Sequence, residues 1–154
     1  MAEPAIWGPS MWRLLHTLAE RLGKQTSLML IQDEQRAWIH FIRSVENVIP
    51  CKRCKAHFGA WIRKNRPESA VTKDAARSWL WGIHDEVNKE RAVVGGPTLQ
   101  DMEGLYASRN SYEITSDSEE CIRHLLEAVQ RAIIATEPFR VFKYRLSLLR
   151  KFTG

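Results

Sequence analysis

Apolar residues recur every three or four positions along most of this chain, which is the spacing of one helix face. The first such stretch follows the turn-forming Trp7-Gly8-Pro9-Ser10 and ends at Gly23. Its apolar positions are Met11, Trp12, Leu14, Leu15, Leu18, Ala19 and Leu22. Since no stretch alternates apolar and polar residues over a useful length, we predict an all-α fold.

The same spacing predicts further helices over about residues 33–48, 50–64, 72–91, 99–106 and 119–135. Pro50 ends the second helix and begins the third, because proline fits the first turn of a helix but not its interior. The polar stretch 108–118 is expected to be a loop, and after Pro138 the pattern leaves helix and disorder open. Short connections favour a compact bundle.

The composition is that of an ordinary globular protein: 44% of the 154 residues are hydrophobic and 27% are charged. No apolar run approaches the roughly 20 residues that a membrane-spanning helix needs. Met1–Pro9 has no basic region followed by an apolar segment, so we expect no secretory signal. The net charge of +5 is concentrated in residues 140–154, which we interpret as a solvated helix face; nucleic-acid binding is not expected.

Candidate chemistry centres on Cys51-Lys52-Arg53-Cys54, at the predicted start of a helix. A helix N-terminus carries partial positive charge, and the neighbouring cations add to it, so a thiolate is stabilised there and its pKa is expected to fall. Cys121 is the only other cysteine, and a total of three argues against a disulfide-stapled extracellular scaffold. The pair is therefore a redox or metal candidate.

A zinc site is one alternative, because His57 follows Cys54 at a spacing that metal ligands use. A structural zinc ion needs four ligands, and no second pair is present; Cys121 and His124 are only loose candidates. A thioredoxin-like fold needs a strand before the cysteine pair, and phosphate-loop and hydrolase motifs are absent from the sequence.

A flavin-linked dithiol is the other alternative. Trp12 and His16 project from one side of the first helix, and Trp81, His84 and Asn88 share a face of the helix over 72–91. Aromatic and imidazole groups of this kind suit the walls of a site for a planar cofactor beside a redox sulfur. Taken alone, each histidine is better explained as a hydrogen-bonded core residue.

Three motifs stand in register: Trp7-Gly8-Pro9-x-x-Trp12-x-x-Leu15-His16, Pro50-Cys51-x-x-Cys54-x-x-x-Phe58 and Trp79-Leu80-x-x-x-His84-x-x-Val87-Asn88. Together they resemble the Erv/ALR family of sulfhydryl oxidases. A short chain with Trp-Gly-Pro, no secretory signal and no structural disulfide is most similar to the branch encoded by large cytoplasmic DNA viruses. The resemblance covers about residues 6–106. It implies an FAD-dependent enzyme that makes disulfide bonds, built as a four-helix bundle around FAD with a short fifth helix.

The resemblance also implies roles for individual residues. Cys54 would lie beside the flavin, and Cys51 would exchange with a substrate dithiol. Electrons would pass from protein thiols through this pair to FAD and then to oxygen, giving hydrogen peroxide. The cofactor-binding set is expected to comprise Gly8, Trp12, His16, Cys54, Phe58, Trp81, His84, Val87, Asn88, Lys89, Arg91 and Tyr106.

Several positions depart from the family pattern. Asp85 replaces an asparagine, and Ile49 replaces an aromatic residue before Pro-Cys. Gly95-Gly96-Pro97 replaces Gly-Lys-Pro, so a phosphate-binding lysine is missing. Trp81 stands where cellular members have a cysteine of a structural disulfide. No separate Cys-x-x-Cys is present to relay electrons, and for Cys121 a buried helical position is favoured over a relay.

We therefore expect residues 1–106 to form the FAD-binding bundle, and residues 107–154 to add a C-terminal helix and basic tail packed on it. The expected partners are protein thiols or a relay dithiol protein, oxygen, and a second copy of the chain in a homodimer. The expected location is the cytoplasm of an infected cell or the virion, and no metal is expected. The alternative is a non-enzymatic helical interaction module with a zinc-bound or structural Cys-x-x-Cys.

Overall fold

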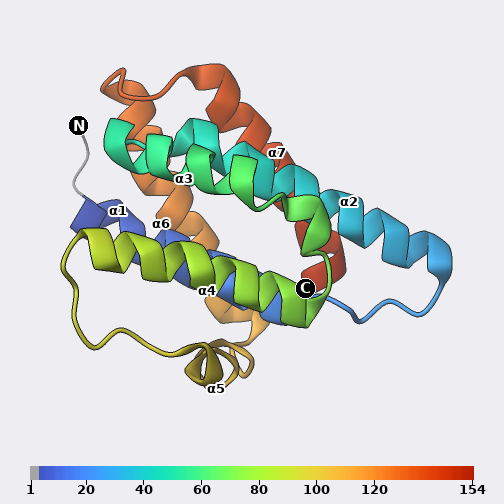
Figure 1. Cartoon of the computed structure of the whole chain (residues 1–154). Coiled ribbons are helices and arrows are strands. Elements are labelled where there is room, and N and C mark those ends of the chain that lie inside the picture. Colours follow the sequence, from blue (N-terminus) through green and yellow to red (C-terminus); the bar gives the residue numbers. More distant parts are fainter. Residues whose placement is uncertain (1–3) are drawn as a thin grey trace.

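Figure 1 shows the computed structural model of the chain, which describes residues 4–154; the first three residues of the Met1–Pro9 stretch lie outside this range. The all-α prediction is confirmed, with no strand among the described residues. None of the described helices is long and apolar enough to cross a membrane. The helices are α1 (Pro4–Glu20), α2 (Leu28–Val45), α3 (Lys52–Lys64), α4 (Lys73–Glu90), α5 (Met102–Tyr106), α6 (Ser111–Gln130) and α7 (Thr136–Thr153). Short 3-10 helices precede three of them: η1 (Glu46–Val48), η2 (Pro67–Ser69) and η3 (Leu99–Asp101).

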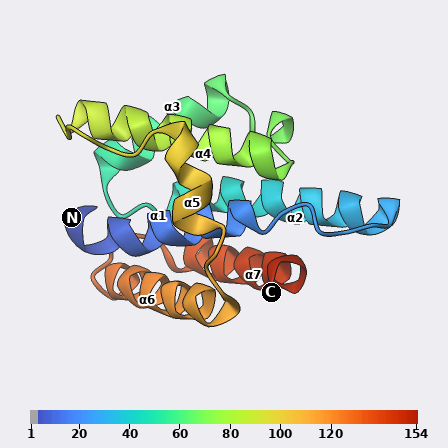
Figure 2. The same ribbon diagram turned by 90° about the horizontal axis from the view of Figure 1, so that it is seen from below.

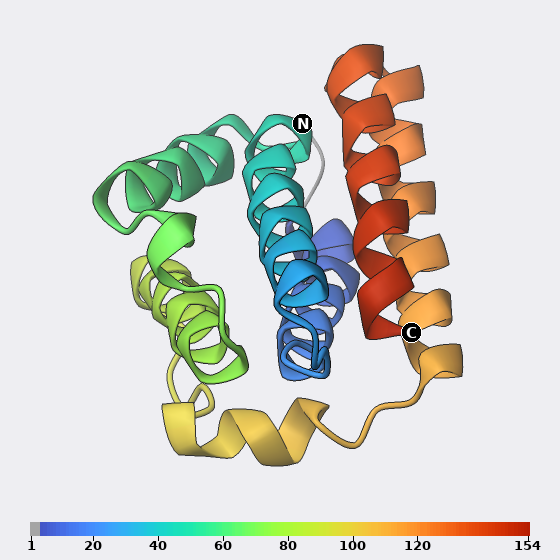
Figure 3. The same cartoon turned by 90° about the vertical axis from the view of Figure 1, so that its right-hand side faces the viewer.

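The helices form three layers (Figure 3). α1 and α2 make the middle layer, α3 and α4 cover one side, and α6 and α7 cover the other, with α6 packed along α1 and α7 along α2. α5 crosses beneath α1 from the α4 side to the α6 side (Figure 2). The middle layer is therefore buried from two directions.

The position of α1 explains the width of its apolar face. A helix covered on two sides must be apolar around most of its circumference, and α1 is buried almost continuously from Met11 to Glu20. The polar end of this run is neutralised: the Glu20 carboxylate accepts hydrogen bonds from Arg77 of α4 at 2.6 and 2.7 Å. Arg77 also pairs with Glu103 of α5 at 3.0 Å, so α1, α4 and α5 are joined at this end.

Three helix starts differ from the prediction. α1 begins at Pro4 and runs through Pro9, which lies inside the helix and leaves the Ala5 carbonyl without its usual helical N–H partner. α2 begins at Leu28, capped by the Ser27 hydroxyl, which accepts from the Leu30 N–H at 3.2 Å. The loop predicted over 108–118 is wrong, because Asn110 and Glu113 form a capping box that starts α6 at Ser111.

The C-terminal segment, for which the sequence pattern left helix and disorder open, is a helix. α7 buries one apolar stripe, Phe139, Phe142, Leu146 and Leu149, which joins the same core cluster as residues of α1 and α2. Part of its basic face is bonded to α6 and so is not simply solvated: Arg150 donates to the Thr115 and Ser118 hydroxyls at 3.1 and 3.3 Å. The division into 1–106 and 107–154 stays a prediction.

The contact of α3 with α4 depends on a glycine. An added Cβ on Gly82 of α4 would lie 2.8 Å from ring atoms of Trp61 in α3. The absence of a side chain at this position therefore lets the two helices approach with the indole between them. This contact sets where the cysteine-bearing helix lies relative to α4.

Candidate active site

Cys51 and Cys54 lie together at the N-terminus of α3. Cys51 is the N-cap residue, in an extended conformation after Pro50, and its Sγ accepts a hydrogen bond from the Cys54 N–H at 3.3 Å. Both are free thiols, and their Sγ atoms are 2.7 Å apart. The first turn of α3 thus holds two thiols within reach of oxidation to a disulfide.

The Cys54 thiol is harder to ionise than the sequence indicates. Burial, the hydrogen bond to Cys51 and the charge of that neighbour raise the pKa of Cys54 to about 12, although Arg91 acts in the opposite direction. The expected fall in pKa is therefore wrong for Cys54 in the dithiol state, because desolvation and a second thiol outweigh the helix terminus.

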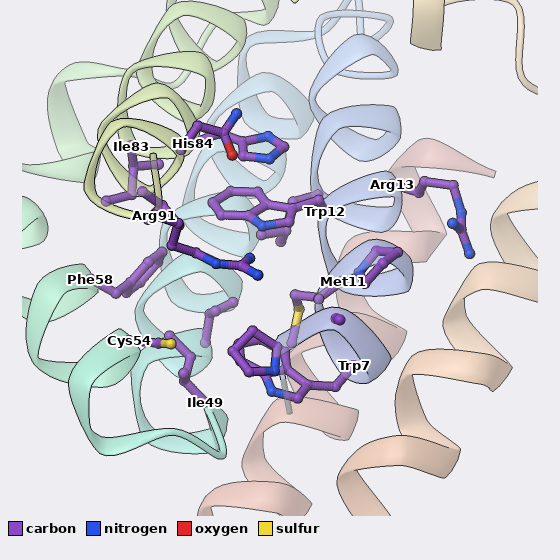
Figure 4. Close-up of a pocket in the computed structure, with 18 of the residues that line it drawn as sticks. Trp7, Met11, Trp12, Arg13, Ile49, Cys54, Phe58, Ile83, His84 and Arg91 are labelled. Atoms are coloured by element: carbon purple, nitrogen blue, oxygen red, sulfur yellow. The ribbon is translucent and has the colours of Figure 1, made fainter. Parts of the chain in front are cut away.

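Cys54 lines a cavity of about 350 Å³ bounded by α1, α3 and α4. Figure 4 shows Trp12 from α1, Cys54 and Phe58 from α3, and His84 and Arg91 from the α4 side arranged around it. Of the predicted cofactor-binding residues, the lining includes Gly8, Trp12, Cys54, Phe58, His84, Val87, Asn88, Arg91 and Tyr106.

Stacked rings form one wall of this cavity. The Trp12 and His84 ring centroids are 3.9 Å apart, with only 3° between the planes. Behind them, His16 Nε2 lies 3.0 Å from His84 Nδ1, and the His16 ring stacks on Tyr106 at 4.9 Å. Burial lowers the pKa of His16 to about 3, with the charge of His84 adding to the effect, and burial lowers the pKa of His84 to about 4 against the opposing Asp85. Both imidazoles are therefore neutral at pH 7.

Arg91 is held at the cavity by the end of α4. It is the C-cap residue, Ala92 follows with φ 57°, and the Val93 N–H donates to the Asn88 carbonyl at 2.8 Å. This is a Schellman motif, in which a left-handed residue closes the helix. Figure 4 shows the Arg91 side chain extending toward the cavity below Trp12. No carboxylate within residues 4–154 pairs with it, in contrast to Arg53, which pairs with Glu90 at 2.6 Å.

Four predicted site residues lie elsewhere. His16 is 2% exposed and lies behind His84. The Trp81 indole N–H donates to the Pro97 carbonyl at 2.9 Å, and Lys89 pairs with Asp85 at 2.9 Å. Cys51 opens on a different cavity.

Sequence reasoning missed several lining residues, among them Trp7, Met11, Ile49 and Ile83. Ile83 has the apolar spacing of a core position of α4, and that spacing is the same whether the neighbouring space is filled by protein or open. Trp7 stands in the same motif as Gly8, which was the available signal.

Two polar contacts of Glu90 join α3 to the last turn of α4. Glu90 accepts a hydrogen bond from Arg53 Nε at 2.7 Å, and its other carboxylate oxygen lies 2.6 Å from His57 Nδ1. His57 is thereby engaged by a carboxylate rather than by the cysteines. Within residues 4–154, no three His, Cys, Asp or Glu side chains are grouped so that they can hold a metal ion.

Cys121 has the buried helical position that was favoured for it. Its Sγ lies 3.8 Å from Met11 Sδ between α6 and α1, and the residue is 1% exposed. Burial, with the charges of Asp117 and Glu120, raises the pKa of this thiol to about 12. A thiol so enclosed is a poor nucleophile.

Known proteins resemble the part of the chain that carries this site. A family model described as the Erv1 / Alr family matches residues 9–97. No solved structure matches the chain significantly.

Three curated relatives illustrate the similarity. The putative FAD-linked sulfhydryl oxidase 088R of Frog virus 3 is 29% identical over 85 residues, which is 55% of this chain and 56% of that protein. The FAD-linked sulfhydryl oxidase of African swine fever virus is 32% identical over 87 residues, or 53% and 65%. Sulfhydryl oxidase 2 of Homo sapiens is 31% identical over 83 residues, or 51% and 12%. The chain thus spans less than two thirds of the length of each.

Proposed function

The chain belongs to the Erv1/Alr family, and on that premise we propose that it is an FAD-linked thiol oxidase that forms disulfide bonds in protein substrates. One observation carries the proposal: one sulfur of an adjacent cysteine pair lines a cavity walled by stacked aromatic rings. Two viral relatives, one named a putative FAD-linked sulfhydryl oxidase and the other an FAD-linked sulfhydryl oxidase, support it.

The residues around the Cys54 cavity suit FAD. Trp12 and His84 offer a flat, neutral surface to a planar ring system. Arg91 supplies a guanidinium with no carboxylate partner in the described chain, as the two phosphates of FAD require. The volume of about 350 Å³ falls in the usual range of ligand sites.

We assign Arg91 to the phosphates in place of the missing family lysine. Lys89, the other basic candidate, is paired with Asp85 and does not line the cavity. Val87 and Asn88, one turn before Arg91, would contact the adenosine part, while Phe58 and Trp12 would enclose the flavin next to Cys54. His16 would act as a positioning residue, since its hydrogen bond fixes the His84 ring.

The protein's own part in the reaction is thiol–disulfide exchange. A substrate thiolate attacks Cys51 Sγ of the oxidised pair, the Cys51–Cys54 bond breaks, and Cys54 leaves as a thiolate. A second substrate thiolate then attacks the substrate sulfur of the mixed disulfide, which releases the oxidised substrate and the Cys51 thiolate. FAD, when bound, supplies the acceptance of two electrons from the reduced pair and their transfer to oxygen, giving hydrogen peroxide. Arg91 favours the Cys54 thiolate that this requires.

The remaining assignments are part of the same proposal. The electron donors are protein thiols, delivered directly or by a relay dithiol protein. A homodimer would use surfaces other than the faces of α1 and α2 that α6 and α7 cover. Two viral relatives support action in the cytoplasm of an infected cell or in the virion.

Two measurements on the purified full chain test the function. The protein should be yellow, with the visible absorption of a flavin, and should consume oxygen when a small dithiol is added. A colourless protein that cannot be loaded with FAD, or one that carries stoichiometric zinc, would contradict the oxidase and favour the non-enzymatic module.

A further inference from the structure

Cys51 opens on a second cavity, separate from the one beside Cys54. This cavity has a volume of about 500 Å³ and is lined on one side by Ile49, Pro50, Cys51, Lys52 and Lys55. Cys51 itself is only 7% exposed. A substrate sulfur must therefore reach it through this space. The shape and charge of the cavity walls then determine which substrates can react.

The opposite wall comes from the far end of the chain. It consists of residues 132–135 in the turn between α6 and α7, together with Pro138 in the first turn of α7. The family model ends at residue 97, so this wall lies outside the part of the chain that the family shares. The space in front of Cys51 is thus completed by residues beyond the family match.

The turn that forms this wall has a fixed shape. Ala132 adopts φ 57°, the Ala132 N–H donates to Val129 O at 3.0 Å, and the Ile133 N–H donates to Ala128 O at 2.8 Å. This is a Schellman motif at the end of α6. Ile133 is partly buried against the core and Ile134 is 9% exposed. The wall therefore presents a defined apolar surface.

The opposite rim is cationic. Lys52 and Lys55 line the cavity and are exposed. Neither has a carboxylate partner within the described chain, whereas Arg53 between them is neutralised by Glu90 at 2.6 Å. The N-termini of α3 and α7 also meet this cavity, and no side chain caps α7. The field at Cys51 thus favours negative charge beside the incoming sulfur.

We propose that this cavity is the substrate site of the enzyme and selects a cysteine in a protein segment with acidic residues on one side and apolar residues on the other. The apolar residues would pack on Ile133, Ile134 and Pro138, and the acidic ones would face Lys52 and Lys55. The proposal rests on the assignment of Cys51 as the exchanging sulfur, and it names the substrate class for that site.

Exchange at Cys51 can be measured without any flavin. The full chain carrying Cys54→Ser and Cys121→Ala leaves Cys51 as the only thiol. The probes are three peptides of equal length, with the cysteine flanked by acidic, neutral or basic residues, each as a mixed disulfide with 5-thio-2-nitrobenzoate. The Cys51 thiolate attacks the peptide sulfur, the aryl thiolate leaves and is detected by its colour, and a Cys51–peptide disulfide forms.

The acidic peptide should react about tenfold faster than the basic one at low salt, with the ratio shrinking as salt is added. Lys52→Glu with Lys55→Glu should reverse the preference. The ratio of the two peptides is the readout, because it cancels any change in the reactivity of Cys51 itself. Equal rates for the three peptides, or a ratio that the double substitution does not move, would overturn the proposal.

The wall is tested separately by filling the cavity. Ala135 is exposed and lines it, so Ala135→Trp should slow exchange with an apolar-flanked peptide far more than exchange with a small aryl disulfide. Thr136→Trp, one residue along and also exposed, is the matched control. Equal slowing by both variants would contradict the role of the wall. Because no step here uses FAD, a failure of this proposal is distinguishable from a failure of the oxidase assignment.

Discussion

The two sulfurs of one cysteine pair face differently built surroundings. The cavity at Cys54 is lined entirely by residues within 4–106, and its polar lining includes the neutral imidazole of His84 and the guanidinium of Arg91, which has no carboxylate partner in the described chain. The cavity at Cys51 is completed by residues 132–138 and has a cationic rim. One turn of helix thus separates a cavity lined mostly by residues inside the family match from one that residues beyond that match complete.

The ends of α4 and α6 have the same local structure, one beside each cavity. Each helix closes with a Schellman motif in which an alanine, Ala92 or Ala132, takes φ 57°. At α4 the motif holds Arg91 beside the Cys54 cavity, and at α6 it holds Ile133 beside the Cys51 cavity. Both cavities therefore depend on the residue at which a helix ends. Hydrophobic periodicity predicts that a helix is present but locates its end poorly.

Replacing each of the two cysteines in turn gives the largest expected effect. Cys51→Ala and Cys54→Ala should each reduce oxygen uptake with a small dithiol to background, since both sulfurs are needed to store two electrons. Exchange with an activated aryl disulfide should survive in Cys54→Ala and vanish in Cys51→Ala. Cys121→Ala is the control and should keep turnover, because its thiol is buried against Met11. Loss of turnover of a protein substrate alone in Cys121→Ala would instead identify a relay.

Gly82→Ala should disturb both sulfurs at once by pushing α3 away from α4. The new methyl would meet Trp61 at 2.8 Å, and overpacking of this kind costs about 1–3 kcal/mol in the free energy of unfolding. Denaturant unfolding measures the loss, and thiol oxidase activity should fall with it. Gly104→Ala, whose added Cβ has nothing within 4 Å, is the matched control. Equal stability of the two variants would contradict the close α3–α4 contact.

Arg91→Ala should affect only the Cys54 side. Loss of one charged contact to a phosphate should weaken FAD binding about tenfold, or roughly 1.4 kcal/mol. Because Arg91 lowers the pKa of Cys54, its removal should also shift the pH–rate profile to higher pH. Lys89→Ala should cause a smaller loss of affinity, since Lys89 is paired with Asp85. The opposite order in fluorescence titrations with FAD would transfer the phosphate role to Lys89.

The pH dependence of stability gives the smallest effect. The pKa of His16 in the folded chain is about 3, well below its ordinary 6.5, so the unfolded chain binds a proton that the folded chain does not. Stability should therefore fall as pH drops below 6.5, with a slope of up to about 1.4 kcal/mol per pH unit for this one proton. His16→Asn should reduce the slope between pH 6.5 and 5.5 more than His40→Asn, because His40 is exposed and its pKa is lowered mainly by partial desolvation. An unchanged slope in His16→Asn would contradict the neutral imidazole wall.

Much of the fold follows from local sequence. The apolar spacing of α1, α3 and α4 predicted those helices, because their burial is strong and regular. The start of α6 was missed although Asn110 and Glu113 carry the capping-box signal; the polar Ser108–Ser118 composition outweighed it. Trp7-Gly8-Pro9-Ser10 was interpreted as a turn that starts the first helix, whereas α1 already begins at Pro4 and runs through Pro9.

The site was predictable only in part. Cys51, Cys54, Trp12 and His84 stand in motifs, and the structure brings the last three of them together around one cavity. Trp81 was assigned to the same face as His84 by spacing alone, but its indole turns to Pro97. The approach of the α6–α7 turn to Cys51 depends on tertiary packing across some eighty residues of chain, and no local pattern encodes it.

Anaerobic titration of the yellow protein with a small dithiol tests the central claim most directly. If Cys54 is the sulfur that serves the flavin, the visible flavin band should bleach in the unmodified chain and in Cys121→Ala. It should persist in Cys54→Ala loaded with the same amount of FAD. Bleaching of Cys54→Ala at the rate of the unmodified chain would contradict the assignment of the two sulfurs to their two cavities.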